Sequence, residues 1–227
     1  MILNLRGTNG AGKTTVFRRF IEENPHEELH GPLPRDGSKG RYVKPIAFAL
    51  QGGAYCVGRR QAGCDGIHPQ VIIADLVRYY GALGHVIFEN VLIAGNRGRW
   101  EALARELVPT CWAVIDTPFD ECLRRIYERR ERRAAEGWKH RGESIQEGTI
   151  EAHYRRVHRN ALGAAQDGID VRVLEHEVAY EQAHDILYAA GWESPAGGLL
   201  LPSRPALPYA SLPSDGGFDR PSVRKAA

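Results

Sequence analysis

An eight-residue pattern near the start of the chain limits the possible fold more than any other feature. Gly7 to Thr14 reads GTNGAGKT and fits G-x-x-x-x-G-K-[ST], in which glycines let successive backbone N–H groups point at phosphate oxygens. An apolar run precedes it at residues 1–6, and residues 14–23 follow with apolar side chains on one helical face. The helix would present its positive end to the same anion. The pattern therefore predicts a phosphate-binding loop between a strand and a helix.

The residues of this loop are of the types that hold a nucleoside triphosphate. We expect Lys13 to reach the β- and γ-phosphates and the Thr14 hydroxyl to bind Mg²⁺. The expected nucleotide-binding set consists of the loop, the residue after it and one arginine further along the chain: Gly7, Thr8, Asn9, Gly10, Ala11, Gly12, Lys13, Thr14, Thr15 and Arg125.

Alternating strand and helix patterns follow the loop. Strands are expected at residues 1–6, 42–50, 54–57, 86–88, 111–115 and 171–174. Helices are expected at residues 14–23, 69–83, 99–107, 119–136, 144–165 and 180–190. Residues 26–41 are polar and rich in Gly and Pro, which is typical of a loop. The alternation predicts an α/β domain with a mostly parallel sheet and helices on both faces.

The composition places limits on the class of protein. A chain of 227 residues allows one domain with a sizeable core and a tail. After residue 190 the sequence turns to Pro, Gly, Ser and Leu, so residues 1–190 are expected to form the domain and 191–227 a tail without its own core. No apolar run is long enough to span a membrane, and no signal peptide is visible. The four cysteines show no CxxC pairing, which favours reduced thiols and a cytoplasmic protein.

An acidic residue ends one of the expected buried strands. Residues 86–88 read VIF and lead directly into Glu89. In proteins with this phosphate loop, such an acid holds Mg²⁺ or its water, or takes a proton from the acceptor. The alternative is a carboxylate that only caps the strand or forms a salt bridge. Asp116 also ends a buried strand, but with Thr117 and Pro118 it is expected to cap the next helix.

The expected helix at 119–136 is rich in arginine. Arg125, Arg129 and Arg133 share one face. A mobile arginine can neutralise the charge that gathers on a γ-phosphate during transfer, so Arg129 is a candidate catalytic residue. Together with the polar stretch that follows, residues 119–145 could act as a lid. The alternative is a solvated helix with Glu–Arg pairs.

The segment between residues 58 and 66 is a glycine-rich loop with two arginines and an aspartate. It lies before a helix, where it could hold the phosphate acceptor. Arg59 and Arg60 could grip a phosphate of that acceptor, and Asp65 could orient or deprotonate a hydroxyl. The alternative is a plain loop with an Asp turn.

These segments together resemble the thymidylate-kinase-like P-loop kinases. The resemblance covers about residues 1–190 and rests on GTNGAGKT, on the strand-end acid in VIFENVL and on the helix that begins DTPFDECLRR. Within that group, ILNLRGTNGAGKTT and GRRQAGCDGI are most similar to small bacteriophage kinases, some of which phosphorylate 5-hydroxymethyluracil in DNA during thymine hypermodification.

The resemblance implies a three-layer P-loop kinase fold with about five parallel strands, ATP as the phosphate donor, and Mg²⁺. It also places Lys13 and Thr14 at the phosphates and metal, Glu89 at the strand-end acid, and Arg125 and Arg129 at lid positions. For a phage-encoded enzyme the location would be the cytoplasm of the infected host cell.

Three functions remain open from the sequence. The first is a kinase that acts on a modified pyrimidine in DNA, the second a kinase of a free nucleoside or nucleotide, and the third an ATPase whose only acceptor is water. No guanine-specifying NKxD and no DxxG switch is present, which disfavours the third. The net charge of +2 is small for a partner as acidic as DNA.

Overall fold

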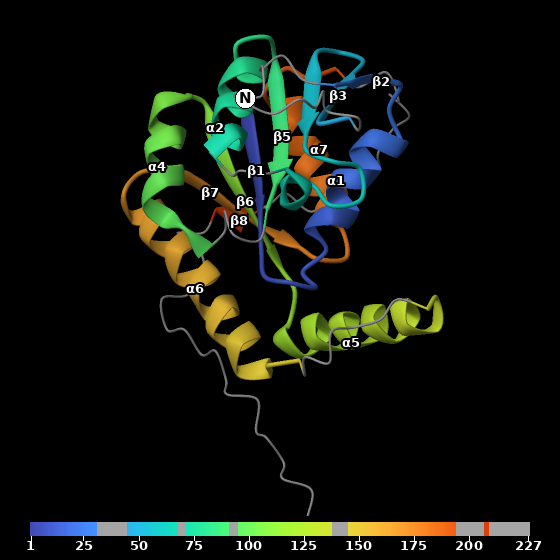
Figure 1. Ribbon diagram of the computed structural model, residues 1–227. Coiled ribbons are helices and arrows are strands. Elements are labelled where there is room, and N and C mark those ends of the chain that lie inside the picture. The colour runs from blue at the N-terminus through green and yellow to red at the C-terminus, as the bar shows by residue number, and fades with distance from the viewer. Residues whose placement is uncertain (31–44, 68–70, 91–94, 138–144, 194–206, 209–227) are drawn as a thin grey trace, which may run out of the picture.

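The computed structural model describes residues 1–30, 45–67, 71–90, 95–137, 145–193 and 207–208. These residues build a single sheet of eight strands in the order β2-β3-β4-β5-β1-β6-β7-β8, with helices on both sides (Figure 1).

The centre of the sheet consists of five parallel strands, as predicted. They are, in spatial order, β4 (Ala54–Val57), β5 (His85–Glu89), β1 (Ile2–Arg6), β6 (Thr110–Asp116) and β7 (Asp170–Glu175). All five residues of β1 are buried, which explains its continuous apolar sequence. The register pairs Leu5 with Glu89, so the phosphate loop after β1 and the acid that ends β5 meet at the same edge of the sheet.

Antiparallel strands extend the sheet at both sides. β2 (His26–Leu29) pairs with β3 (Ala47–Leu50), which forms a hairpin with β4 around residues 51–53. The prediction of a loop over 26–41 is wrong for residues 26–29, because the polar sequence HEEL forms an edge strand whose middle residues are exposed. Residues 31–44, including the expected start of a strand at 42, lie outside the described part of the chain.

The opposite edge of the sheet is formed by β8 (Leu207–Pro208), which pairs with β7. These two residues belong to the segment expected to be a tail. The domain boundary at residue 190 stays a prediction, although the sheet continues beyond it.

Helices cover both faces, as the sequence predicts. α2 (Val71–Gly81), α4 (Arg97–Glu106) and α6 (Glu147–Gln166) supply the core of one face, and α1 (Lys13–Glu22) and α7 (Ala179–Ala189) that of the other. Neighbouring residues of a strand enter opposite cores: Cys111 and Ala113 join α1 and α7, whereas Trp112 joins α2, α4 and α6. Trp192, beyond the last helix, is fully buried and donates from Nε1 to the Gln51 carbonyl.

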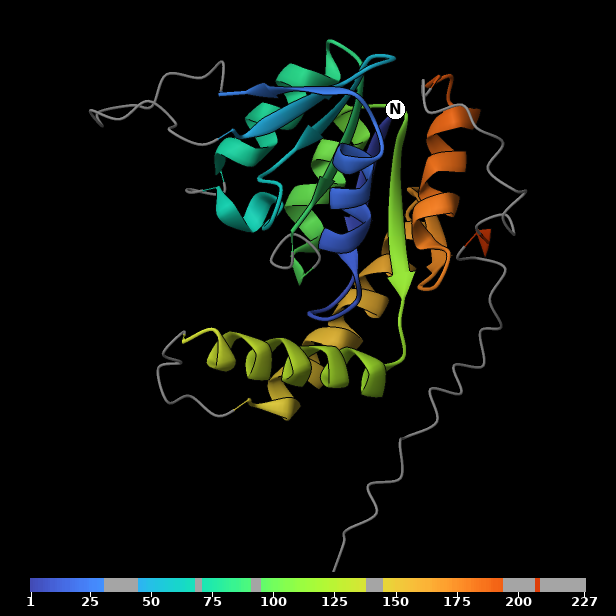
Figure 2. The ribbon, with the colours of Figure 1, turned by 90° about the vertical axis from the view of Figure 1, so that its right-hand side faces the viewer.

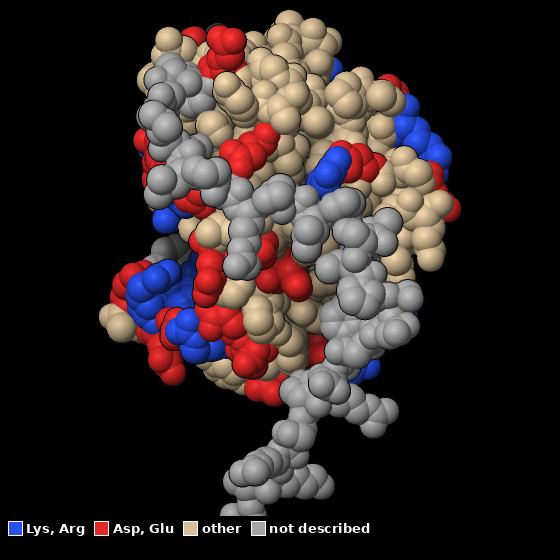
Figure 3. Space-filling view, turned by 180° about the vertical axis from the view of Figure 1, so that it is seen from behind, with Lys and Arg blue, Asp and Glu red and all other residues tan. Residues whose placement is uncertain are grey.

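One helix stands away from the sheet. α5 (Phe119–Ala135) leaves the end of β6 and projects below the carboxyl ends of the strands (Figure 2). Seen from behind, basic side chains gather over this helix with acidic ones among them (Figure 3). None of the helices in the described part of the chain combines the length and apolar character that a membrane span requires.

Candidate active site

The phosphate loop lies between β1 and α1 and packs on the first turns of α5. Gly10 has a φ of +83°, and a Cβ at this position would lie 2.4 Å from the carbonyl oxygen of Cys122. Only glycine fits such a backbone conformation at such a contact without strain. The hydroxyl of Thr117 donates to the Ala11 carbonyl at 3.0 Å. The loop is therefore held from below by the segment that starts α5.

Lys13 is buried against the phosphate loop. Its Nζ donates to the Thr8 carbonyl at 2.8 Å. Burial lowers the pKa of Lys13, while the negative charges of Glu89 and Asp65 oppose this shift. A bound triphosphate would supply the negative charge that this buried ammonium needs.

Glu89 lies directly beside the phosphate loop. Its Oε1 accepts a hydrogen bond from the Thr14 hydroxyl at 2.8 Å, and its side chain is buried. Burial raises the pKa of Glu89, and the nearby Lys13 and the hydrogen bond from Thr14 partly offset the shift. The second oxygen, Oε2, has no hydrogen-bond partner among the described residues.

This pair fits a magnesium ion. Mg²⁺ prefers oxygen ligands and is usually bound by one or two carboxylates together with substrate phosphates and water. Thr14 Oγ1 and the free oxygen of Glu89 are donors of that kind next to the phosphate loop. Metal binding by Thr14 and Glu89 stays a prediction, and this geometry supports it.

A tight loop after β4 packs on the Glu89 carboxylate. Arg59 and Gly63 exchange two backbone hydrogen bonds, at 2.8 and 2.7 Å, and close the loop. Gly63 has a φ of +49°, and a Cβ there would lie 2.1 Å from Glu89 Oε1. The 3₁₀ turn η1 (Cys64–Gly66) follows and carries the exposed Asp65. The loop therefore brings Asp65 and Glu89 to the same side of the phosphate loop.

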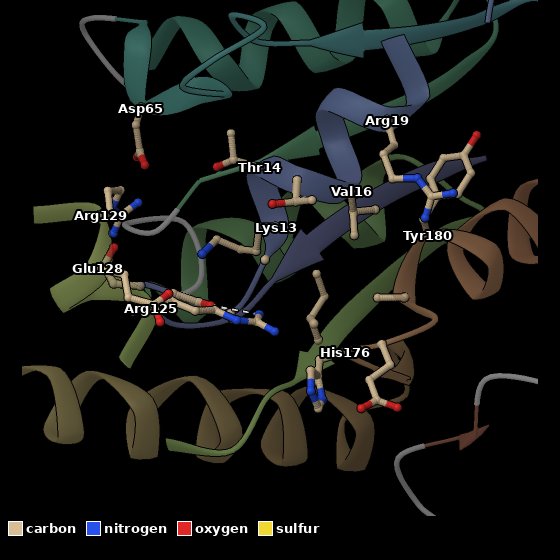
Figure 4. A pocket seen from close by; sticks show the side chains of 18 of the residues that line it. Lys13, Thr14, Val16, Arg19, Asp65, Arg125, Glu128, Arg129, His176 and Tyr180 are labelled. Atoms are coloured by element: carbon tan, nitrogen blue, oxygen red, sulfur yellow. Dashed lines mark hydrogen bonds between the residues drawn. The ribbon is translucent and has the colours of Figure 1, made fainter. Parts of the chain in front are cut away.

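A cavity of about 460 Å³ runs along the phosphate loop. Asp65 lines one end and Arg19, His176 and Tyr180 line the other, with Lys13 between them (Figure 4). The full lining comes from the loop and α1, from η1, from α5 and from the β7–α7 turn: Asn9, Gly10, Ala11, Gly12, Lys13, Thr14, Thr15, Val16, Arg19, Asp65, Ile115, Arg125, Glu128, Arg129, Arg132, His176, Glu177, Ala179 and Tyr180. The predicted nucleotide-binding residues from Asn9 to Thr15, together with Arg125, thus share one cavity.

The arginines of α5 face this cavity with a different spacing from the expected one. Arg125, Arg129 and Arg132 line it, whereas Arg133 is not among its lining residues. Arg125 donates to Glu121 at 2.6 Å and to the Gly10 carbonyl at 3.3 Å. Arg129 makes no hydrogen bond or ion pair with the described residues. Partial burial, and then the neighbouring arginines, lower the pKa of Arg129.

The structure does not bring Arg59 and Arg60 into this cavity. Arg60 points to the edge of the sheet, where it bonds His26 Nε2 at 2.8 Å and Glu28 at 3.4 Å. The methylene groups of Arg59 lie against Gly66. Both arginines therefore contact other parts of the protein outside the cavity. Their role in acceptor binding stays a prediction.

The expected capping role of Asp116 is wrong. The N-cap of α5 is Pro118, no side chain caps the helix, and Asp116 is exposed. Thr117 is the residue of this turn that reaches the phosphate loop.

Several residues at the site carry no sequence signal that sets them apart. Arg19, His176 and Tyr180 line the cavity from segments that are about 160 positions apart in the chain, and His153 of α6 contacts Thr8 of the loop. Each lies on an otherwise ordinary amphipathic helix or turn. Only the fold brings them together.

Known proteins similar to this chain are kinases. A 5-hmdU DNA kinase of Pseudomonas phage M6 is 28% identical over 199 residues, which is 83% of this chain and 98% of that protein. A 5-hmdU DNA kinase of Pseudomonas phage PaMx11 is 30% identical over 138 residues, 57% of this chain and 69% of that protein. Another, from Delftia phage PhiW-14, is 23% identical over 148 residues, covering 57% and 52%.

No family model matches the chain. Among solved structures, deoxyadenosine kinase from M. mycoides with bound dATP aligns with a TM-score of 0.40 and 13% identity, over 84% of this chain and 98% of that one.

Proposed function

The chain belongs to the family of phage 5-hmdU DNA kinases, and on this premise we propose that it transfers the γ-phosphate of ATP to the hydroxymethyl group of 5-hydroxymethyluracil in DNA. That the chain is a kinase follows from the family. The choice of acceptor is our proposal.

The observation that carries the proposal is the arrangement of the cavity around the phosphate loop. Lys13 and Thr14 lie at its centre, three arginines of α5 line one wall, and Asp65 lines the end nearest to Glu89. A donor lying on the loop would thus present its terminal phosphate toward two carboxylates. An acceptor hydroxyl needs such a carboxylate within reach.

The two carboxylates differ in exposure, and we assign them different roles. Glu89 is fully buried and bonded to Thr14, so it would hold the metal ion together with that hydroxyl. Asp65 is exposed in the cavity wall, where it could accept a hydrogen bond from the acceptor hydroxyl. As the hydroxymethyl oxygen bonds to the γ-phosphorus and the bond to ADP breaks, Asp65 would take the hydroxyl proton.

Positive charge would stabilise the transferred phosphoryl group. Lys13 reaches it from the loop, and Arg129, which has no ion pair within the described residues, reaches it from α5. Bound Mg²⁺ would add to this by neutralising charge on the β- and γ-oxygens. A base stacked inside a duplex is out of reach of such a cavity, so the target must be flipped out or single-stranded.

The experiment offers the protein γ-labelled ATP and Mg²⁺ with four acceptors: DNA that contains 5-hydroxymethyluracil, the same DNA with thymine, free 5-hydroxymethyl-deoxyuridine and its monophosphate. Lys13→Ala serves as the inactive control. We expect label only in the modified DNA, and none with Lys13→Ala. We also expect the KM for DNA to rise steeply with salt, because a polymer releases counterions when it binds.

Label in the free nucleoside or nucleotide, with none in DNA, would replace the proposal with a small-molecule kinase. Free phosphate released at one rate with every acceptor would indicate an ATPase.

A further inference from the structure

The end of the cavity that lies away from Asp65 is built from two helices. Arg19 comes from α1, and Tyr180 comes from the first turn of α7 (Figure 4). Neither residue touches the phosphate loop through any hydrogen bond in the described part of the chain, so the phosphate chemistry does not account for them.

The Arg19 guanidinium is held flat and in one place. Its Cζ lies 4.0 Å from the centroid of the Tyr180 ring. Nε donates to Glu23 at 2.6 Å and Nη1 donates to Glu181 at 2.9 Å. Guanidinium groups are planar and weakly hydrated, and they stack on aromatic rings. The carboxylates of Glu23 and Glu181 therefore hold the guanidinium in place on the Tyr180 ring.

The support beneath Arg19 is rigid. Tyr180 is only 4% exposed, and its ring lies 4.8 Å from that of Phe20 in the core. The Arg19 side chain, in contrast, is 37% exposed and lines the cavity. The tyrosine covers one face of the guanidinium, so the exposed part of this cavity-lining side chain includes the open opposite face.

We propose that this open face is the stacking platform for the purine base of the donor nucleotide, so that base, Arg19 and Tyr180 form one stack. The proposal rests on the proposed function, because it places the triphosphate on the phosphate loop with its γ-phosphate toward Asp65 and Glu89. The base then belongs at the opposite end of the cavity, where Arg19 lies.

Such stacking is a contact with the flat face of the base. Every base has such a face, but a purine covers more of the platform than a pyrimidine does. The platform therefore predicts that ATP binds more tightly than CTP, and that both bind more tightly than inorganic tripolyphosphate, which has no base.

The test is a calorimetric titration of the full chain with Mg²⁺ and, separately, ATP, CTP and inorganic tripolyphosphate. Arg19→Ala removes the platform, and Arg19→Lys keeps a cation for the two glutamates but removes the plane. Arg18→Ala is a matched control, because Arg18 pairs with Glu22 on the same helix at the same spacing, is exposed and does not line the cavity.

We expect Arg19→Ala and Arg19→Lys to weaken ATP binding by about five- to a hundredfold, the range of base stacking, and to leave tripolyphosphate binding unchanged. Unchanged tripolyphosphate binding also shows that the variants are folded. Arg18→Ala should bind all three like the wild type.

An equal loss for ATP and tripolyphosphate would overturn the proposal, because Arg19 would then contact phosphate. Unchanged ATP binding in both Arg19 variants would overturn it as well. If the wild type binds neither ATP nor tripolyphosphate, the donor site of the proposed function fails first, and this inference fails with it.

Discussion

The Thr8 hydroxyl and His153 Nδ1 lie 3.1 Å apart, although 145 positions separate the two residues. Thr8 belongs to the phosphate loop and its carbonyl holds the Lys13 ammonium. His153 belongs to α6, whose Asn160 also bonds the Gly95 carbonyl. α6 therefore braces the loop that positions Lys13.

Loss of this brace is expected to weaken nucleotide binding more than it slows the chemical step. One hydrogen bond of about 1 kcal/mol corresponds to about fivefold in affinity. His153→Ala and Thr8→Val should therefore each raise the KM for ATP by about that factor and leave kcat nearly unchanged. Thr8→Ser, which keeps the hydroxyl, should behave like the wild type.

A double-mutant cycle checks that the two side chains act on each other. We expect the Thr8→Val/His153→Ala protein to be no worse than either single variant. Fully additive losses would show that the contact does not support the loop.

Adding a single methyl group at Gly63 is predicted to slow the reaction strongly. Gly63→Ala places a Cβ where the Glu89 carboxylate now lies, 2.1 Å from Oε1. Displacing a reacting group by about 1 Å can cost about 100-fold in rate. We expect kcat to fall by about that factor in steady-state assays with ATP and the acceptor.

Gly53→Ala is the matched control for this variant. Gly53 also has a positive φ, +81°, but nothing lies within 4 Å of its Cβ position. Both variants carry the same kind of backbone strain, so both should lower Tm, and only Gly63→Ala should lose activity. Equal activity in the two would disprove the contact between this loop and Glu89.

Glu89 is predicted to lower the stability of the nucleotide-free protein. Its pKa is raised by burial, so the native state favours the protonated form, while in the unfolded chain the carboxyl ionises near its ordinary pKa of 4.5. The wild type should therefore match Glu89→Gln at pH below about 4.5 and lose stability relative to it as pH rises through the folded pKa.

At neutral pH we expect Glu89→Gln to melt a few degrees higher, since about 1 kcal/mol moves Tm by about 2–4 °C in a chain of 150–250 residues. Its kinase activity should be nearly lost. The measurement is a pair of melting curves at several pH values without nucleotide. A difference in Tm that is the same at every pH would contradict a titrating Glu89.

Two arginines of α5 should differ sharply in kinetic importance. Arg129 lines the cavity without an ion pair among the described residues, whereas Arg124 is exposed and bonded to Glu121 and Glu128. Arg129→Ala is expected to reduce kcat by about 100- to 1,000-fold, the cost of removing one charge-stabilising donor. Arg124→Ala, as an exposed pair, should cost less than about threefold. Single-turnover rates with saturating ATP compare the two, and similar rates would refute the assigned role of Arg129.

The positions of the phosphate loop and of Glu89 in the fold could be predicted from the sequence, because both follow directly from local patterns, whereas their roles stay predictions. A glycine-rich motif dictates its own backbone, and an acid at the end of an apolar strand lies at the carboxyl edge of a parallel sheet. The parallel sheet with helices on both faces followed from the alternation of strand and helix patterns, and the five parallel strands followed from the family resemblance.

Features that depend on contacts between distant segments could not be predicted. The strand at residues 26–29 carries no apolar pattern because it lies at an edge of the sheet, and its His26 is one partner of Arg60. Arg60 therefore lies away from the cavity because of a partner in another segment, which the sequence around Arg60 does not indicate. In the same way, Arg19 and Tyr180 stack in the cavity wall although they are far apart in the sequence.

The close approach of Gly10 to Cys122 has a consequence for the whole of α5. At its first turns this helix packs closely on the predicted phosphate loop, which limits the angle at which the helix can leave the sheet. A larger residue at position 10 would tilt the helix as one body and shift the reach of Arg125, Arg129 and Arg132 together. Under the proposed function, phosphate binding and the positions of these arginines are therefore coupled, and a substitution that changes the loop at Gly10 also moves the arginines.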